Sequence, residues 1–254
     1  MPEKKEKNAE EIRLNRFLSE AGVCSRREAD HLAESGRVTV DGRPALPGQK
    51  IRGHERVAVD GRPVRVQKKK VILAVHKPPG VVCTTSEKDR APNVVELVRY
   101  PLRVYPAGRL DKDSEGLLLL TNDGLLMDAL LRARNGHEKE YLVETDKPVT
   151  EEFLRGMAAG VPILETVTKP CQVKRVGRNT FRIILTQGLN RQIRRMCEYF
   201  GYRTVKLKRV RIVNIRLGNL APGAYRELTA DEEQKLRRLV LQDKKRASIK
   251  AERR

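Results

Sequence analysis

An acidic loop that leads into an apolar segment has the residue types best suited to chemistry. The loop, Gly108–Gly116, holds Asp111 and Asp113, and residues 117–120 are all leucine, followed by Asn-Asp-Gly at 122–124. A short apolar run between such signals predicts a buried strand. A carboxylate on the loop entering a buried strand is held rigidly and can still face a cleft. Asp111 is therefore a candidate nucleophile or electrostatic group, although a turn or capping role is the commoner fate of a loop aspartate.

The acidic pair Asp111 and Asp113 could suggest a metal site or a two-carboxylate glycosidase, but no third acidic ligand stands nearby and the two side chains would point apart on an extended segment. The 4 histidines and 4 cysteines are scattered along the chain, and no C-x-x-C pair occurs. Zinc ligands usually come in close pairs, so we predict no metal site. The cysteines are expected to be inert thiols in a reducing cytoplasm.

Two later segments carry further candidates. Residues 138–143 alternate across Tyr141 and Val143, which predicts a strand. A strand tyrosine is most often a core residue. Residues 190–200 have a helical spacing of apolar side chains, and we predict a helix that Asn190 caps and Gly201 ends.

Three arginines stand at the start of this predicted helix: Arg191, Arg194 and Arg195. Cations are unfavourable at a helix N-terminus unless anionic groups lie nearby. Arg194 is flanked by core positions, and a partly buried arginine needs a carboxylate. We predict that Arg194 forms an ion pair with Asp111, which keeps that carboxylate ionised and oriented.

The elements that must position these groups form two domains. Residues 11–65 predict a compact helix–helix–strands module, in which Ser25 and Glu28 form a capping box and Asp-Gly pairs at 41–42 and 60–61 mark hairpins. We expect disorder over 1–10, a basic linker over 66–71, and an α+β domain over 72–232. A capping box at Thr229 and Glu232 opens a last helix, and residues 233–254 hold its end and a disordered basic tail.

Composition restricts the partner. The formal net charge is +20 and the chain has 34% charged residues, so it attracts a polyanion. Nucleic acid is the first candidate and an anionic membrane is the rival, but no apolar stretch approaches the ~20 residues of a spanning helix. The N-terminus has no apolar segment of a secretion signal, and we expect a cytoplasmic protein. With 4% aromatic residues and no tryptophan, base stacking is not the main binding device.

The stretch 108–124 closely resembles the catalytic motif of pseudouridine synthases, in which the aspartate matching Asp111 is essential. The resemblance implies that Arg109 enters the RNA helix where the target base is flipped out. It also implies that Tyr141 packs on the uracil and accepts the C5 proton, with Lys139 supporting the site. The family has an arginine that matches Arg194.

The segment 25–42 resembles the S4 RNA-binding domain. The chain is thus similar to the pseudouridine synthases that act on ribosomal RNA, and most similar to their 23S branch. The resemblance implies an N-terminal S4-like domain and a catalytic domain with a central, mostly antiparallel sheet and flanking helices. It also implies an isomerisation that needs no cofactor. Beside the catalytic candidates Asp111, Tyr141 and Arg194, the expected RNA-binding residues are Arg109, Arg26, Arg27, Arg37, Lys139, Arg191, Arg195 and Lys208.

Several alternatives remain open at this point. The substrate is expected to be a 23S rRNA stem-loop, with a tRNA anticodon loop or 16S rRNA as the other RNA targets. A non-catalytic S4-type RNA-binding protein would explain the charge but leave Asp111 idle. A nucleoside hydrolase with Asp111 as nucleophile would release free uracil. No apolar patch is obvious, and we expect a monomer.

Overall fold

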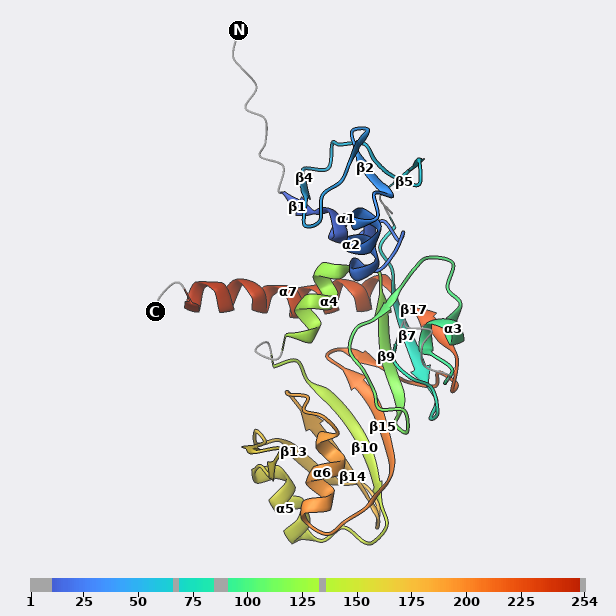
Figure 1. Ribbon diagram of the computed structural model, residues 1–254. Coiled ribbons are helices and arrows are strands. Elements are labelled where there is room, and N and C mark those ends of the chain that lie inside the picture. The colour runs from blue at the N-terminus through green and yellow to red at the C-terminus, as the bar shows by residue number, and fades with distance from the viewer. Residues whose placement is uncertain (1–10, 66–68, 85–90, 133–135, 252–254) are drawn as a thin grey trace. The chain divides into compact units, whose positions relative to one another are not determined.

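The computed structural model describes residues 11–65, 69–84, 91–132 and 136–251, with side chains as far as residue 241 (Figure 1). The chain divides into two compact units, residues 1–70 and 71–254. The segment 1–10, predicted to be disordered, and residues 66–68 of the predicted linker lie outside the described residues. No helix in the described ranges is long and apolar enough to cross a membrane.

The first unit begins with two helices, α1 (Leu14–Glu20) and α2 (Arg26–Glu34). The predicted capping box of α2 is confirmed, because Ser25 Oγ accepts from the Glu28 amide at 3.2 Å and the Glu28 carboxylate accepts from the Ser25 amide at 3.2 Å. The two helices bury Phe17, Leu18 and Leu32 in the unit's own core.

Short strands complete this unit: β1 (Ile12–Arg13), β2 (Val38–Val40), β3 (Arg43–Pro44), β4 (Lys50–Ile51), β5 (Val57–Val59) and β6 (Arg62–Pro63). The order β3-β2-β5-β6 forms one small sheet, and β1 pairs with β4. Asp41 and Asp60 both have positive φ, as does the glycine after each of them. Two consecutive positive φ angles define the two-residue turn that matches the twist of a hairpin, so the predicted hairpins are confirmed.

The second unit is built on a large sheet. Its strands are β7 (Ile72–Lys77), β8 (Tyr105–Pro106), β9 (Glu115–Thr121), β10 (Lys139–Thr145), β13 (Gln172–Arg175), β14 (Thr180–Leu185), β15 (Thr204–Ile212), β16 (Ile215–Arg216) and β17 (Tyr225–Glu227). Their order is β13-β14-β10-β15-β9-β7-β17, with β16 on β15 and β8 on β9. A separate hairpin joins β11 (Pro162–Ile163) to β12 (Thr166–Val167).

Pairing within the large sheet is antiparallel except between β15 and β9, which run parallel. Residues 117–120 of β9 have no exposed surface. Leu117 and Leu119 pack into one hydrophobic cluster, and Leu118 and Leu120 pack into another on the opposite face of the sheet. This explains why the run is continuously apolar rather than alternating. The predicted buried strand and the α+β class with a mostly antiparallel sheet are confirmed.

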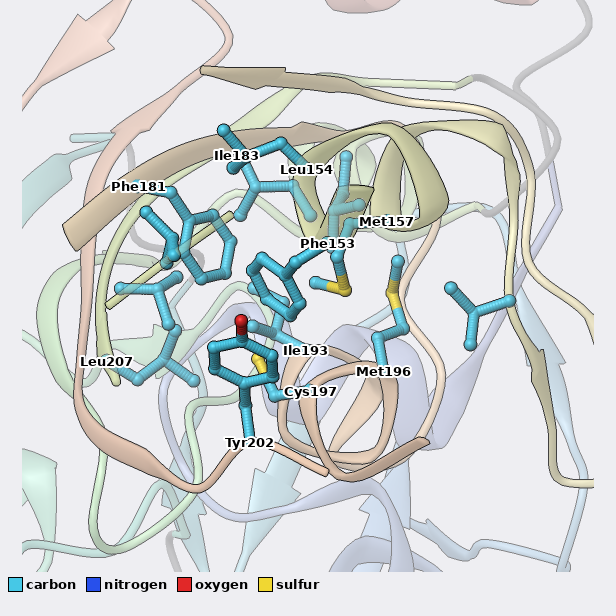
Figure 2. Packing of buried hydrophobic residues seen from close by; sticks show 14 of the residues in the cluster. Phe153, Leu154, Met157, Phe181, Ile183, Ile193, Met196, Cys197, Tyr202 and Leu207 are labelled. Carbon is cyan, nitrogen blue, oxygen red and sulfur yellow. The ribbon is translucent and has the colours of Figure 1, made fainter. Parts of the chain in front are cut away.

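Helices α3 (Val94–Val98), α4 (Gly124–Leu131), α5 (Glu151–Ala159), α6 (Gln192–Tyr199) and α7 (Ala230–Ala251) flank the sheet. Helices α5 and α6 pack beside β13 and β14 (Figure 1). Figure 2 shows how Phe153 of α5, Phe181 of β14 and Ile193 of α6 interlock in a single cluster. This packing seats α6 on the sheet, and the start of α6 carries the three predicted arginines.

The structure differs from the sequence prediction at three places. The sequence His-Lys-Pro-Pro-Gly at 76–80 indicates a turn after the apolar residues 72–75, but His76 and Lys77 belong to β7. Asn190 does not cap α6; Arg191 is the capping residue, in the left-handed region with φ 49°, and makes no side-chain capping bond. The predicted disordered tail also differs, because the backbone of α7 continues to Ala251, and no proline or glycine in 230–251 interrupts it.

Candidate active site

A cleft of about 430 Å³ opens beside β10 and β15 in the second unit. Five parts of the chain line it: the loop 107–114, the end of α4, the segment 137–141 at the start of β10, the segment 185–193, and β15. The predicted catalytic residues Asp111 and Tyr141 both line this cleft, as do Arg109, Lys139 and Arg191. Residues far apart in the sequence therefore meet in one place.

Asp111 lies on the loop before β9 and its side chain is 33% exposed. The loop is held by backbone contacts: the Ser114 amide donates to the Asp111 carbonyl at 3.1 Å, and the Leu110 amide donates to Cys83 Sγ at 3.3 Å. The carboxylate faces Arg191, whose Nη1 lies 4.0 Å from Asp111 Oδ2. Asp111 is thus partly solvated, fixed at its backbone, and paired loosely with one cation.

The predicted ion pair between Arg194 and Asp111 is wrong. Arg194 is buried as predicted, but its Nη1 donates to the Thr204 carbonyl at 3.3 Å and its Nη2 donates to the Asp113 carbonyl at 3.4 Å. The guanidinium of Arg194 thus bonds to the backbone of the loop, and no ion pair among the described residues joins it to the Asp111 carboxylate. Carbonyl dipoles, not a carboxylate, compensate its burial.

Tyr141 and Lys139 come from β10, where both are half-buried. Tyr141 stands between Ile183 of β14 and Arg209 of β15 in the sheet register. Burial lowers the pKa of Lys139, and the charge of Arg209 lowers that pKa further. The same face of the sheet therefore brings an aromatic ring and two cations to the cleft.

The other predicted RNA-binding residues have different surroundings within their own units. Arg109 is exposed at the cleft, and Arg195 donates from Nε to the Asn190 carbonyl at 3.2 Å. Lys208 does not line the cleft; its Nζ lies 3.6 Å from Glu115 Oε1. In the first unit, Arg37 forms an ion pair with Asp60 at 2.6 Å. Arg26 and Arg27 are exposed in the first turn of α2.

Lys77 is a residue near the site that sequence reasoning missed. It has no exposed surface, and its Nζ donates to the carbonyls of Pro78 at 2.9 Å, Val81 at 2.7 Å and Lys112 at 3.1 Å. Burial lowers its pKa, which the nearby Cys83, Asp113 and Asp111 partly offset. The available signal was a lysine at the end of a strand whose first four residues are apolar.

Arg209 is the second missed residue. It stands in a segment, 205–217, whose many lysines and arginines favour an exposed, RNA-facing strand, but only 3% of Arg209 is exposed. Its Nε donates to the Leu117 carbonyl at 2.7 Å and its Nη1 to the Arg109 carbonyl at 3.5 Å. The signal was the period-two spacing from Leu207, which puts residue 209 on the inward face of β15.

Acidic, histidine and cysteine side chains are the usual protein ligands of zinc. Among the described residues, no group of three or more of them is placed to hold a metal ion. The titratable side chains that line the cleft are a carboxylate (Asp111), a phenol (Tyr141), an imidazole (His137) and several lysine and arginine cations.

Comparisons with known proteins connect this geometry to a family. The family model for RNA pseudouridylate synthase matches residues 71–199, and the S4 domain model matches residues 12–57. Over 222 residues the chain is 53% identical to the dual-specificity RNA pseudouridine synthase RluF of Salmonella typhi, covering 87% of this chain and 76% of that protein. The ribosomal large subunit pseudouridine synthase B of Bacillus subtilis is 36% identical over 237 residues, covering 90% of this chain and 96% of that protein.

A solved structure shares the fold. The crystal structure of a pseudouridylate synthase superposes with a TM-score of 0.66 at 28% identity, covering 89% of this chain and 99% of that chain. The first unit matches the S4 model, and the second carries the cleft with Asp111 and Tyr141. The chain therefore belongs to the RNA pseudouridylate synthase family, with an S4 domain ahead of the synthase domain, and is an isomerase.

Proposed function

We propose that the protein converts a specific uridine of 23S ribosomal RNA to pseudouridine in the cleft around Asp111. The reaction breaks the N1–C1′ bond, turns the base, joins C5 to C1′, and moves the C5 proton away while N1 gains one. Atoms and electrons balance within the nucleotide, so no cofactor takes part. The observation that carries the proposal is the meeting of Asp111 and Tyr141 in one cleft of a chain that belongs to this family.

The residues have separate roles in this proposal. Asp111 acts at the sugar or at the base and promotes cleavage of the glycosidic bond. Tyr141 packs against the uracil and helps to remove the C5 proton. Arg194 supports the reaction through the backbone of the Asp111 loop, since it donates to the Asp113 carbonyl at 3.4 Å. Lys139 and Arg191 contact the RNA or its target nucleotide from the walls of the cleft.

RNA binding supports the same reaction. The target base must leave the helical stack, which costs a few kcal/mol and least in a loop, so we propose a 23S rRNA stem-loop as substrate. Arg109, exposed at the cleft, fills the vacancy by stacking and hydrogen bonding. Arg26, Arg27, Arg37, Arg195 and Lys208 contribute phosphate contacts. We propose that the protein acts as a monomer in the cytoplasm.

A second RNA substrate is also proposed. Similar proteins of Salmonella typhi and Escherichia coli strain K12, 53% and 52% identical to this chain, are named dual-specificity RNA pseudouridine synthases. A tRNA anticodon loop presents unpaired bases on a short stem, as an rRNA stem-loop does. The same cleft would then process both, with 16S rRNA as the remaining target to test.

The test is release of tritium from uridine labelled at C5 in transcripts of 23S rRNA, 16S rRNA and tRNA. Wild type is expected to release tritium from 23S rRNA, and Asp111→Asn is expected to release none while its RNA affinity stays the same. Activity retained by Asp111→Asn would overturn the assigned role of Asp111. Tight RNA binding without release from any transcript would favour a binding protein, and free uracil would favour a hydrolase.

A further inference from the structure

A buried arginine lies between the strand that carries Tyr141 and the strand that follows Asp111. Arg209 of β15 is paired in register with Gly116 of β9 on one side and with Tyr141 of β10 on the other. It lines the cleft although only 3% of it is exposed. Asp111 stands on the loop that enters β9, so Arg209 is the link between the two halves of the site.

The guanidinium of Arg209 fastens the backbone on both sides of Asp111. Its Nη1 donates to the carbonyl of Arg109, before Asp111, and its Nε donates to the carbonyl of Leu117, after it. Lys77 and Arg194 bond to the carbonyls of Lys112 and Asp113 in the same loop. Backbone carbonyls thus hold all three buried cations, and the carboxylate of Asp111 remains available to the substrate.

The charge of Arg209 is not cancelled by a carboxylate. None of the ion pairs in the described part of the chain includes Arg209, and no described group accepts a hydrogen bond from its buried Nη2. Burial is the main cause of the lowered pKa of Lys77 and of Lys139, and the charge of Arg209 lowers both further, so its field reaches these two lysines. A charge in a site shielded from water acts more strongly on its surroundings than the same charge in solvent.

We propose that Arg209 is a positioning residue that holds the Asp111 loop and stabilises, through its buried charge, the negative charge that the uracil gains during the reaction. The inference rests on the proposed function. When the N1–C1′ bond breaks, its electron pair stays with the base, and the anion spreads over N1 and the two carbonyl oxygens. The fixed cation of Arg209 favours that state over the neutral nucleotide.

The experiment compares two substrates in single turnover: an RNA with uridine at the target and the same RNA with 5-fluorouridine. Fluorine withdraws electrons, so the 5-fluorouracil anion depends less on the protein for its stability. Loss of the starting nucleoside is followed by mass spectrometry after nuclease digestion. Arg209→Gln is expected to slow the reaction of uridine about 100-fold and that of 5-fluorouridine only about tenfold. The loss for uridine lies in the range seen when one electrostatic donor is removed from an active site.

Two further variants separate charge from position. Arg209→Lys keeps the cation but does not reach both carbonyls, so its losses are expected to be equal for the two substrates. If Arg209→Gln does not fold, the rates of Arg209→Lys on uridine and on 5-fluorouridine still test the inference. Arg175→Gln makes the same chemical change at an exposed position of β13, 44% exposed at the side chain, and is expected to match wild type on both.

The possible outcomes are distinct. Equal losses for uridine and 5-fluorouridine with a folded Arg209→Gln, or unequal losses with Arg209→Lys, would overturn the electrostatic role. An unchanged rate of Arg209→Gln on uridine would overturn both parts of the inference. If wild type consumed uridine in none of the three transcripts, the proposed function would fail, and this inference would fall with it.

Discussion

Arg191 and Asp111 face each other across the cleft, with Arg191 Nη1 4.0 Å from Asp111 Oδ2. Arg194, one turn further along the chain, binds only backbone carbonyls in the described structure. The first arginine is 41% exposed at its side chain and the second is buried. The two therefore differ in what they can contribute: Arg191 is a solvent-exposed counterion of Asp111, and Arg194 is a buried support of the loop backbone.

This difference predicts that one alanine variant loses function and the other loses stability. Arg191→Ala is expected to weaken RNA binding or turnover while the free energy of unfolding stays within about 0.5 kcal/mol of wild type. Arg194→Ala is expected to lose about 2 kcal/mol of stability, because two carbonyls lose their buried donor. Urea unfolding and single-turnover rates measure both effects. A stability loss confined to Arg191→Ala would contradict the assignment.

Gly116 predicts a large stability effect from a single methyl group. Its φ is +111°, and an added Cβ would lie 2.2 Å from the carbonyl oxygen of Arg209. Gly116→Ala must open the pairing of β9 with β15, so we expect a loss of about 3 kcal/mol or more.

Gly188→Ala is the control for this substitution, since nothing lies within 4 Å of its added Cβ. The midpoint of urea unfolding is compared for the two variants. Equal midpoints would mean that the β9–β15 contact is looser than the structure indicates.

Lys77 predicts a pH dependence of stability. Burial lowers its pKa in the folded protein below the ordinary value of 10.5. Below the lowered pKa both states hold the proton, and the folded state bears the whole cost of burying the charge. Between the lowered pKa and 10.5 the unfolded chain binds more protons, so the contribution of Lys77 to the free energy of unfolding rises with pH.

The measurement uses a variant that does not titrate. The free energy of unfolding of wild type minus that of Lys77→Met is expected to rise as the pH approaches 10.5. Lys174→Met, at an exposed position of β13, controls for the loss of a surface lysine. A difference that falls with rising pH would have the wrong sign for a lowered pKa.

Cys197 predicts slow thiol chemistry. Burial raises its pKa to about 11, and the side chain has no exposed surface. At pH 8 roughly one thousandth of such a thiol is ionised, and the thiolate is the form that reacts. Iodoacetamide is therefore expected to label Cys197 only after unfolding in urea. Peptide mass spectrometry reads the labelling, with the partly exposed Cys83 as internal comparison; rapid labelling of native Cys197 would show that α6 opens easily.

The sequence predicted those elements whose signals are local. The capping box at Ser25, the Asp-Gly hairpins and the apolar run of β9 each depend on a few neighbouring residues, and the structure has all of them. It also predicted that Asp111 and Tyr141 belong to one site, but through a family resemblance rather than through spacing. Their position in a common cleft agrees with that expectation.

What the sequence missed depends on contacts between distant segments. Arg194 bonds to the carbonyls of Thr204 and Asp113, which are 10 and 81 residues away in the sequence, and no local pattern identifies such partners. Lys77 and Arg209 look like ordinary charges of a basic chain until β7, β9 and β15 are placed side by side. Arg209 and Leu117 are 92 residues apart, and no local pattern links them.

Strand β15 sets the minimal length of a working chain, and it lies beyond the region that the family model matches. The matched synthase region ends at residue 199, and all of Asp111, Tyr141, Arg191 and Arg194 precede that point. Strand β15 begins at Thr204 and lies between β10 and β9 in the sheet, so it separates the strand of Tyr141 from the strand that follows Asp111. A fragment that ends at residue 199 would keep Asp111, Tyr141 and Arg194 but would lack β15, the strand that lies between β10 and β9. The smallest working piece of the chain is therefore set by a structural strand, not by the last catalytic side chain.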